Sequence, residues 1–127
     1  MAYEQPIALH GTFAASADLS THQYKLVKIS GANAVTVSAA ATDASIGILQ
    51  NKPASGQDAV VCTIGISKAV AGAAIAAGAE LMADASGRVI TAAAAAGANR
   101  SVGVAVEAVA AAGEIVSVLL IGPVRML

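Results

Sequence analysis

The residues that could carry out chemistry are few in this chain and are scattered along it. The two histidines, His10 and His22, have no metal-ligand spacing to each other or to the single cysteine. We interpret them as solvated or capping side chains, with a metal site as the alternative. Cys62 has no second cysteine to pair with and lies within an apolar run. That position favours a buried structural thiol over a nucleophile.

Apart from Glu4 near the start of the chain, the carboxylates mostly stand within two residues of Gly or Ser, where turns and strand ends are expected. They are Asp18, Asp43, Asp58, Asp84, Glu80, Glu107 and Glu114. Glycine motifs that contain serine, such as Ser45-Ile46-Gly47, lack the Gly-x-Ser-x-Gly pattern of a hydrolase. No glycine-rich run ends in the lysine of a phosphate-binding loop. We therefore predict that the protein is not an enzyme, and we assign no catalytic, cofactor-binding or metal-binding residue.

Composition indicates one domain with a thin core. The chain has 127 residues, of which 57% are hydrophobic and 12% are charged. Much of the hydrophobic fraction is alanine, which buries little apolar area per residue. A thin core under a sparsely charged surface favours a homo-oligomer, in which other subunits cover part of that surface. A monomer with an alanine-rich surface is the alternative.

Charge and hydropathy argue against two classes of partner. The net charge is −1 and the seven Lys and Arg residues form no basic stripe, so we expect no nucleic-acid binding. The most apolar stretch, Ala69 to Ala79, is too short to span a bilayer, and no membrane association is expected. The first residues also lack a basic segment followed by an apolar one, so we expect no secretion signal.

The elements that must position these residues form an internal sequence repeat, with an offset of 56 to 57 residues. Glycines mark the repeat because they occupy positions that need positive φ or close backbone approach. The matched pairs are Gly31 with Gly87, Gly47 with Gly103, Gly56 with Gly113 and Gly65 with Gly122. We predict an N-terminal arm over residues 1–21 and a single β-domain over 22–127. Its two repeats would span 22–68 and 78–125.

Short β-like runs separated by turn residues fill both repeats. The expected strands are Tyr24–Ile29, Ala34–Ser38, Ser45–Gln50, Asp58–Lys68, Glu80–Ala83, Val89–Ala92, Ser101–Val106 and Glu114–Ile121. The alanine-rich stretches 69–77 and 92–96 are predicted to be loops or extended connections, because each is short and contains or adjoins glycine. The expected fold is all-β, a small barrel or sandwich built from two repeated β-units, with an extended N-terminal arm.

The second repeat resembles a known family. Residues 101–108 and 111–119 are similar to the "G-V-A-x-E-A" and "A-G-E-x-V-x-V" strands of the capsid cement, or head decoration, proteins of tailed bacteriophages. Residues 77–89 resemble the "A-G-x-x-x-x-x-D-x-x-G-R-V" hairpin of the same family. The resemblance covers about residues 77 to 120 directly, and the first repeat only through its likeness to the second.

This resemblance implies a structural protein of the virion, made in the host cytoplasm. It would bind the outer surface of the assembled capsid and bridge major capsid subunits against the pressure of packaged DNA. The implied partners are the major capsid protein and further copies of the chain, with a homotrimer favoured. Several modest contacts made by one oligomer would raise the total affinity. No cofactor is implied.

The N-terminal arm is the candidate capsid-binding segment, because an extended arm can add a strand to a neighbouring sheet edge. Its candidate residues are Tyr3, Glu4, Gln5, Pro6, Ile7 and Leu9. A frayed terminus is the alternative interpretation, and the C-terminal segment 123–127 is a second candidate. A receptor- or glycan-binding β-module of a phage fibre or adhesin is the alternative function, disfavoured because aromatic residues are scarce. A small enzyme with a hidden site ranks below it.

Overall fold

The computed structural model describes residues 9–93 and 99–126, and every element within them is a β-strand. The strands are β1 (Leu9–Ala15), β2 (Leu26–Gly31), β3 (Ala34–Val37), β4 (Ser45–Leu49), β5 (Asp58–Val70), β6 (Glu80–Ala83), β7 (Val89–Thr91), β8 (Arg100–Ala105) and β9 (Ile115–Met126). The eight expected strands correspond to β2 through β9, and β1 is additional. The described part of the chain holds no helix long and apolar enough to cross a membrane.

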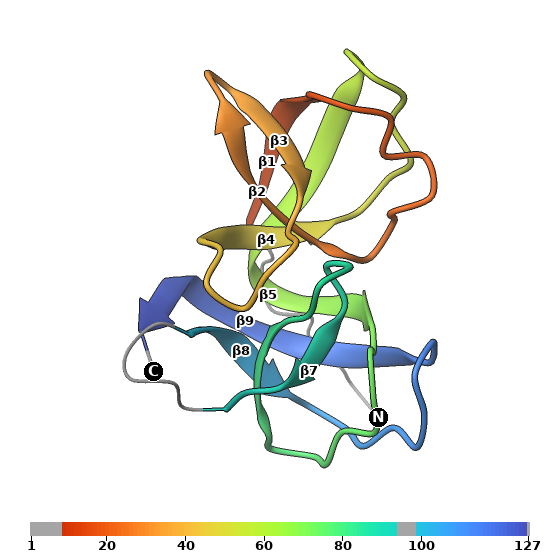
Figure 1. The fold of residues 1–127 in the computed structure, drawn as a ribbon, viewed down its shortest axis with the longest axis vertical. Helices are drawn as coiled ribbons and strands as arrows, with labels where there is room; N and C mark the ends of the chain where they lie inside the picture. The colour runs from red at the N-terminus through yellow and green to blue at the C-terminus, as the bar shows by residue number, and fades with distance from the viewer. Residues whose placement is uncertain (1–8, 94–98, 127) are drawn as a thin grey trace, which may run out of the picture.

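The first five strands close into a barrel, which forms the upper half of the molecule in Figure 1. The order around it is β1-β3-β2-β4-β5, and β5 returns to pair with β1. The pairing of β1 with β3 is parallel, through Ala15 and Val35, and the other pairings are antiparallel. This closure confirms the expected all-β barrel and leaves no open sheet edge between β1 and β5.

The remaining strands form a second barrel below the first, in the order β5-β9-β8-β6-β7. It closes through an isolated parallel bridge between Ala71 and Val89, which joins the chain just after β5 to β7. This bridge is the counterpart of the parallel pair Ala15 and Val35 in the first barrel. Both barrels are therefore closed in the same way, as expected for two repeated β-units.

The long strand β5 belongs to both barrels. Its first part pairs with β1 and β4, and from Ile64 onward it pairs with β9. Gly65 lies at this change of partner with a φ of 117°, a backbone conformation that is strained for any residue with a Cβ. A single continuous strand thus connects the two barrels and holds them at a fixed spacing.

The strand registers in the two barrels match. Val27 of β2 pairs with Gly47 of β4, and Leu81 of β6 pairs with Gly103 of β8 in the same manner. The cores match as well, because each buried residue of the first core has a counterpart in the second. The first core contains Ala15, Leu19, Val27, Val35, Leu49, Ala59 and Val61, and the counterparts are Ala71, Ile75, Leu81, Val89, Ala105, Val116 and Val118.

Two expectations need correction. The predicted arm over residues 1–21 is wrong from Leu9 onward, because β1 is a barrel strand and Ala15 and Leu19 are buried in the core. The predicted match of Gly31 with Gly87 is also wrong. The residue that corresponds to Gly87 is Asn33, because both have positive φ, 53° for Asn33 and 77° for Gly87, and both occupy the turn between paired strands.

Candidate docking surfaces

The carboxylates serve turns and loops. Asp84 accepts hydrogen bonds from the backbone N–H groups of Ser86 and Arg88 and forms an ion pair with the Arg88 side chain at 2.8 Å. Glu114 accepts two backbone N–H groups in the turn before β9, and Glu107 accepts the N–H of Ser117. These contacts confirm the prediction that the carboxylates stand at turns and strand ends. They stabilise loop conformations.

Asp43 has the most elaborate contacts of these carboxylates. It accepts the backbone N–H groups of Ala39 and Ala40 and pairs with Lys28 at 2.9 Å. Hydrogen bonding to the Ala39 N–H, together with the bond to Lys28, holds the pKa of Asp43 below its ordinary value. This loop is therefore held by a charge that is present at neutral pH.

Cys62 is buried, as predicted, with a side chain 1% exposed. Burial raises the pKa of its thiol, which makes the thiolate scarce at neutral pH. The Nδ1 atom of His22 lies 3.3 Å from the Nζ atom of Lys25. Within the described ranges 9–93 and 99–126, no three metal-ligating side chains come together.

The aromatic residues that the structure describes pack inward. Phe13 lies against the first core, while Tyr24 lies against the second core and under the ammonium group of Lys68. Neither ring forms the exposed platform that covers an apolar sugar face. The glycan-binding alternative therefore has no support from these two side chains.

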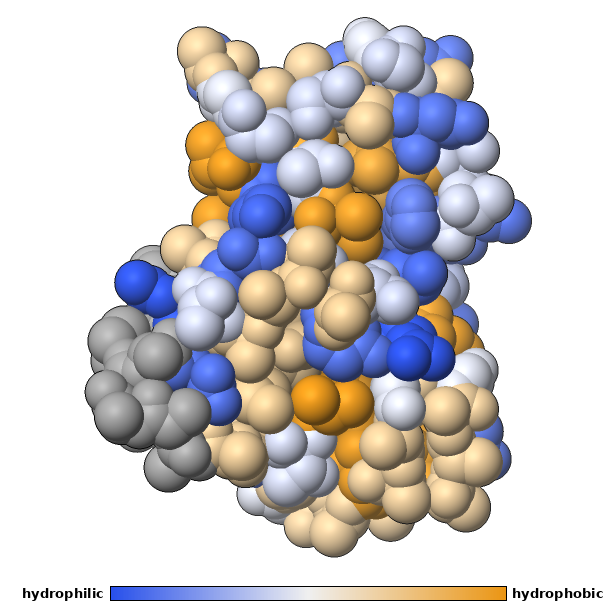
Figure 2. All heavy atoms as spheres, in the orientation of Figure 1, coloured by the Kyte–Doolittle hydropathy of each residue, from blue (hydrophilic) through white to orange (hydrophobic). Residues whose placement is uncertain are grey.

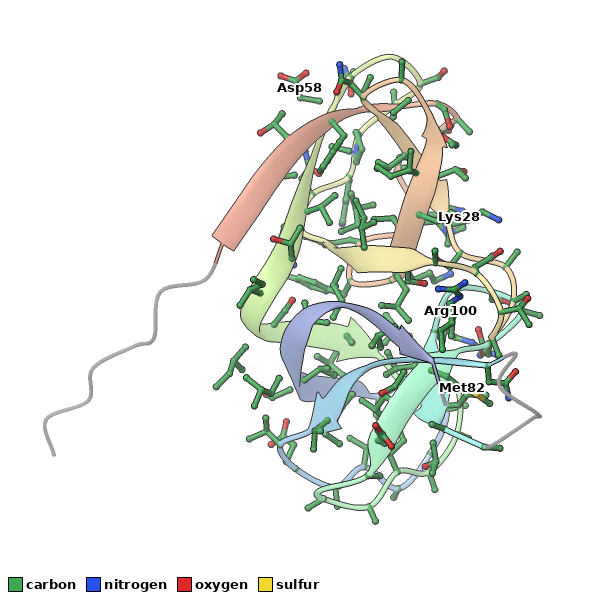
Figure 3. The ribbon with its side chains drawn as sticks, turned by 90° about the vertical axis from the view of Figure 1, so that its left-hand side faces the viewer. Lys28, Asp58, Met82 and Arg100 are labelled. Carbon is green, nitrogen blue, oxygen red and sulfur yellow. The ribbon has the colours of Figure 1, made fainter. Side chains whose placement is uncertain are left out.

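The two barrels meet through an apolar interface. Leu26, Ile48 and Cys62 belong to strands of the first barrel, yet they pack into the core cluster of the second. The backbone adds to this contact, because the Leu26 N–H donates to the Gly87 carbonyl at 2.8 Å. Ala69, Ala83, Val102 and Leu120 of the second barrel are buried in the same cluster. Figure 3 shows Arg100 at the level where the barrels meet.

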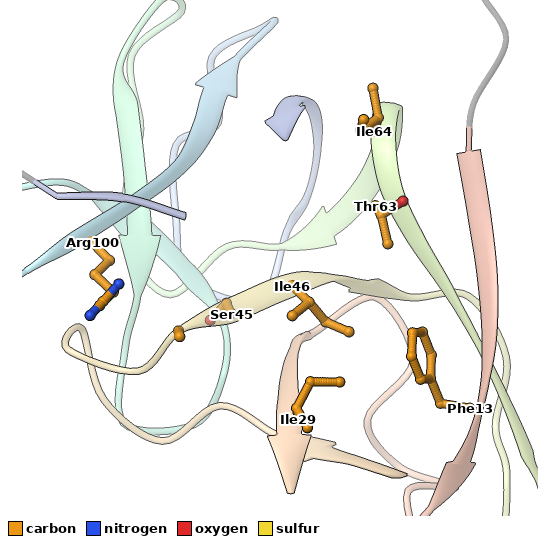
Figure 4. Close-up of a pocket in the computed structure, with 8 residues that line it drawn as sticks. Phe13, Ile29, Ser45, Ile46, Thr63, Ile64 and Arg100 are labelled. Carbon is orange, nitrogen blue, oxygen red and sulfur yellow. The ribbon is translucent and has the colours of Figure 1, made fainter. Parts of the chain in front are cut away.

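An apolar pocket of about 460 Å³ opens on the first barrel. In Figure 4 the side chains of Phe13, Ile29 and Ile46 point toward one another within it. The residues that line it are Phe13, Ile29, Ala44, Ser45, Ile46, Thr63, Ile64 and Arg100. Ile29 is 49% exposed, which is unusual for a large apolar side chain facing a concave site. The pocket is shaped for an apolar partner.

A second apolar surface covers the outside of the second barrel. It consists of the exposed side chains Ile66, Val106, Ile115 and Leu119. Leu119 pairs with Ile66 on one side and with Val104 on the other, so Ile66, Leu119 and Val104 form an apolar row across three strands, and Ile115 and Val106 lie outside that row. Figure 2 shows one face of the molecule, on which weakly hydrophobic residues cover much of the lower barrel.

Most of the predicted capsid-binding residues precede the part of the chain that the structure describes. Tyr3, Glu4, Gln5, Pro6 and Ile7 lie outside the described residues, as does residue 127 at the C-terminal end. Leu9 begins β1, and its backbone pairs with Ile64, which lines the pocket. The C-terminal segment continues β9, where Met126 pairs with Arg100. The arm prediction is thus neither supported nor contradicted by these contacts.

Sequence reasoning missed the pocket residues Phe13, Ile29 and Ile46. A signal for them was present in the repeat. Phe13 and Ile29 correspond in strand register to Ala69 and Ala83, which are small and buried. A large apolar residue in one repeat at a position where the other repeat has alanine indicates that the two positions have different neighbours. The comparison can be made only when the two repeats are aligned by their strand pairing.

These features define a class of protein. Two closed barrels share one strand, the carboxylates of Asp43, Asp84, Glu107 and Glu114 stabilise turns and loops, and the pocket and the outer row are apolar. Such a molecule is built to contact other macromolecules through its surface. The family model for phage cement proteins matches residues 8–120, which include the first barrel and most of the second. The chain belongs to the phage cement protein family, as its second repeat led us to expect, and it is a structural protein of the phage capsid.

The fold is similar to that of a solved phage protein. It is the N base of head fiber gp8.5 in bacteriophage phi29, with a TM-score of 0.68 at 18% sequence identity. The match covers 90% of this chain and 94% of that chain. At this identity the similarity shows the fold alone. No curated protein matches the sequence.

Proposed function

We propose that this protein binds the outer surface of the assembled phage head and bridges neighbouring major capsid subunits. The observation that carries the proposal is the family match, which extends over the first barrel and most of the second. The described fold has a form that suits bridging, because β5 runs through both barrels and keeps their outer surfaces at a fixed spacing. A rigid body with two separate surfaces can contact two shell subunits at once.

The physical basis of the stabilisation is linkage. A protein that binds only the assembled shell stabilises that shell by mass action, in proportion to the logarithm of its concentration over its dissociation constant. Each additional contact made by the same oligomer acts at a high effective concentration. A homo-oligomer, with a trimer favoured by the family, therefore needs only modest affinity per contact.

The candidate capsid-binding segment remains the N-terminus, with Tyr3, Glu4, Gln5, Pro6, Ile7 and Leu9. Because β1 begins at Leu9, the segment that can be removed without touching the barrel is residues 1–8. Loss of one anchoring aromatic side chain commonly costs about 2 kcal/mol at an interface. Tyr3 is the aromatic residue in this segment.

The test is binding of a variant lacking residues 1–8 to purified, undecorated heads. We expect its occupancy to fall by orders of magnitude, while circular dichroism shows an unchanged β-fold. The matched control replaces residues 1–8 by Gly and Ser at the same length, and it should bind as poorly as the deletion. Full occupancy by both variants would move the capsid contact to the barrel surfaces or to the C-terminal segment. Failure of the unaltered protein to bind heads would refute the proposed function itself.

A further inference from the structure

The interface between the two barrels joins two different surfaces, and each surface has a second copy elsewhere in the chain. The first barrel contributes Leu26, Ile48 and Cys62, here called the inserting face. The second barrel contributes Ala69, Ala83, Val102 and Leu120, here called the receiving face. Because the barrels are repeats, the first barrel also has a receiving face and the second also has an inserting face.

The strand register identifies the unused receiving face. Phe13, Ile29, Ile46 and Thr63 correspond to Ala69, Ala83, Val102 and Leu120. These four residues line the apolar pocket of the first barrel. Ile29 of the first barrel is 49% exposed, whereas its counterpart Ala83 in the second barrel is 2% exposed. This difference is expected if the site in the first barrel is empty and the site in the second is filled. The pocket is the position that the other barrel fills in the second repeat.

The unused inserting face follows from the same register. In the first barrel, Ile48 pairs with Leu26 on one side and with Cys62 on the other. In the second barrel, Val104 pairs in the same way with Glu80 and Leu119. The inserting face Leu26, Ile48 and Cys62 therefore corresponds to Glu80, Val104 and Leu119. Cys62 is 1% exposed within the chain, whereas Leu119 is 40% exposed. The apolar row on the second barrel is therefore the surface that would enter a receiving face.

We infer that the pocket of one copy receives the Val104 and Leu119 face of a second copy, so that copies of this chain assemble head to tail. The contact would continue the barrel-to-barrel interface that already exists within the chain. Val104 is smaller than its counterpart Ile48, and Leu119 is larger than Cys62, for which the volume of about 460 Å³ leaves room. An interface between two different surfaces forms a ring if its rotation closes. This inference deepens the homo-oligomer of the proposed function, and a ring of three copies would contain six barrels.

Disulfide trapping tests the geometry directly. Within the chain, the Leu26 N–H donates to the Gly87 carbonyl, so these two residues are backbone neighbours. Their counterparts are Glu80 and Asn33, which the inference places together between copies. In a Cys62→Ala background, the double variant Glu80→Cys with Asn33→Cys should form a ladder of covalent oligomers under oxidation. A mixture of the two single variants should form dimers only, and each single variant alone should form none.

The outcome separates this interface from others. Dimers from either single variant alone would mean that like surfaces meet, which overturns the head-to-tail arrangement. A double variant that stays monomeric on a non-reducing gel at high concentration also overturns it. Because the experiment uses no phage heads, it is independent of capsid binding. An oligomer that forms without these cross-links would preserve the proposed homo-oligomer while refuting this interface.

Three charge variants test the two surfaces by mass photometry. Leu119→Asp should weaken association by at least about tenfold, because the variant loses the apolar contact of Leu119 and desolvates a carboxylate in a pocket whose lining is mainly apolar. Ile115→Asp is the control, since Ile115 lies on the same strand, is 44% exposed, and corresponds to Asp58, which is exposed in the first barrel. The Ile115→Asp variant should leave the oligomer unchanged.

The pocket side of the interface is tested by Ile29→Asp, which should weaken association as much as Leu119→Asp does. If Ile29→Asp weakens association and Leu119→Asp does not, another occupant fills the pocket.

Discussion

Gly47 and Gly103 hold the same place in the two barrels. A Cβ at Gly47 would collide with the backbone carbonyl of Cys62, and a Cβ at Gly103 would collide with the backbone carbonyl of Leu119. Gly47 lies on β4, which pairs with the long strand β5, and Gly103 lies on β8, which pairs with the long strand β9. The close approach of these backbones is a repeated feature of the architecture, and it excludes any side chain at either position.

The first prediction concerns these two glycines. Gly47→Ala and Gly103→Ala should each lower the free energy of unfolding by about 3 kcal/mol, because backbone atoms cannot move aside without breaking strand pairs. Gly31→Ala is the control, since its added Cβ would meet only the Ala34 Cβ at 3.9 Å. Chemical denaturation measures all three. Equal effects at Gly31 and Gly47 would contradict the close approach.

The second prediction concerns the corresponding turn residues Asn33 and Gly87. Gly87→Asn should destabilise the protein by about 2 kcal/mol or more, because a Cβ there would collide with the Val37 side chain across the barrel interface. Asn33→Gly should be nearly neutral, since Asn33 is exposed and both residue types tolerate positive φ. Thermal unfolding of the two variants gives the comparison. A neutral Gly87→Asn would show that the turn does not press against the first barrel.

The third prediction concerns pH. The folded-state pKa of Asp43 lies below its ordinary value of 3.8, so its stabilising contribution is present above that value and is lost as pH falls through the lower folded-state pKa. Asp43→Asn should cost about 1 kcal/mol of unfolding free energy at neutral pH, and the difference from the parent protein should shrink in acid. Urea denaturation at neutral pH and at about pH 2.5 measures it.

Lys28→Gln provides the partner control for Asp43. It removes the cation at 2.9 Å while leaving the Ala39 and Ala40 N–H groups in place. Its effect should be smaller than that of Asp43→Asn, because the Ala39 N–H is the leading cause of the lowered pKa of Asp43. A difference that is as large in acid as at neutral pH would contradict the role of the charge.

The fourth prediction concerns Cys62. Its thiol lies between the barrels with a raised pKa, so a thiol reagent should label it at least about 100-fold more slowly in the native protein than in denaturant. A cysteine placed by Ser55→Cys in an exposed turn, in a Cys62→Ala background, provides the fast reference. Rapid native labelling of Cys62 would mean that the two barrels separate readily.

Much of the local structure follows from the sequence, because turns and strands depend on nearby residues. Gly56 and Gly113 have φ values of 82° and 90° and open space around them, in equivalent turns before β5 and β9. Residues 69–77 form a strand end and an extended connection, as predicted from their glycine content. The described part of the second alanine-rich stretch, residues 92–93, also continues without helix. The family follows from strand and turn motifs of the same local kind.

Other features were decided by the tertiary structure. The sequence pattern placed residues 9–15 in an arm because β1 has weak periodicity, but its role as a barrel strand depends on pairing with β5 far along the chain. The spacing of glycines in the sequence aligns Gly87 with Gly31, whereas the strand register aligns Gly87 with Asn33. Register is set by long-range strand pairing, which a change of two residues in loop length is enough to shift.

The candidate docking site shows the same division. Apolar side chains at Phe13, Ile29 and Leu119 are visible in the sequence, but the sequence alone cannot distinguish them from core residues. Their counterparts Ala69, Ala83 and Cys62 are buried because one barrel covers the other within the chain. The two described barrels share one interface, and the pocket and the apolar row lie outside it. Which of the repeated apolar positions remain exposed is therefore fixed by packing between the barrels.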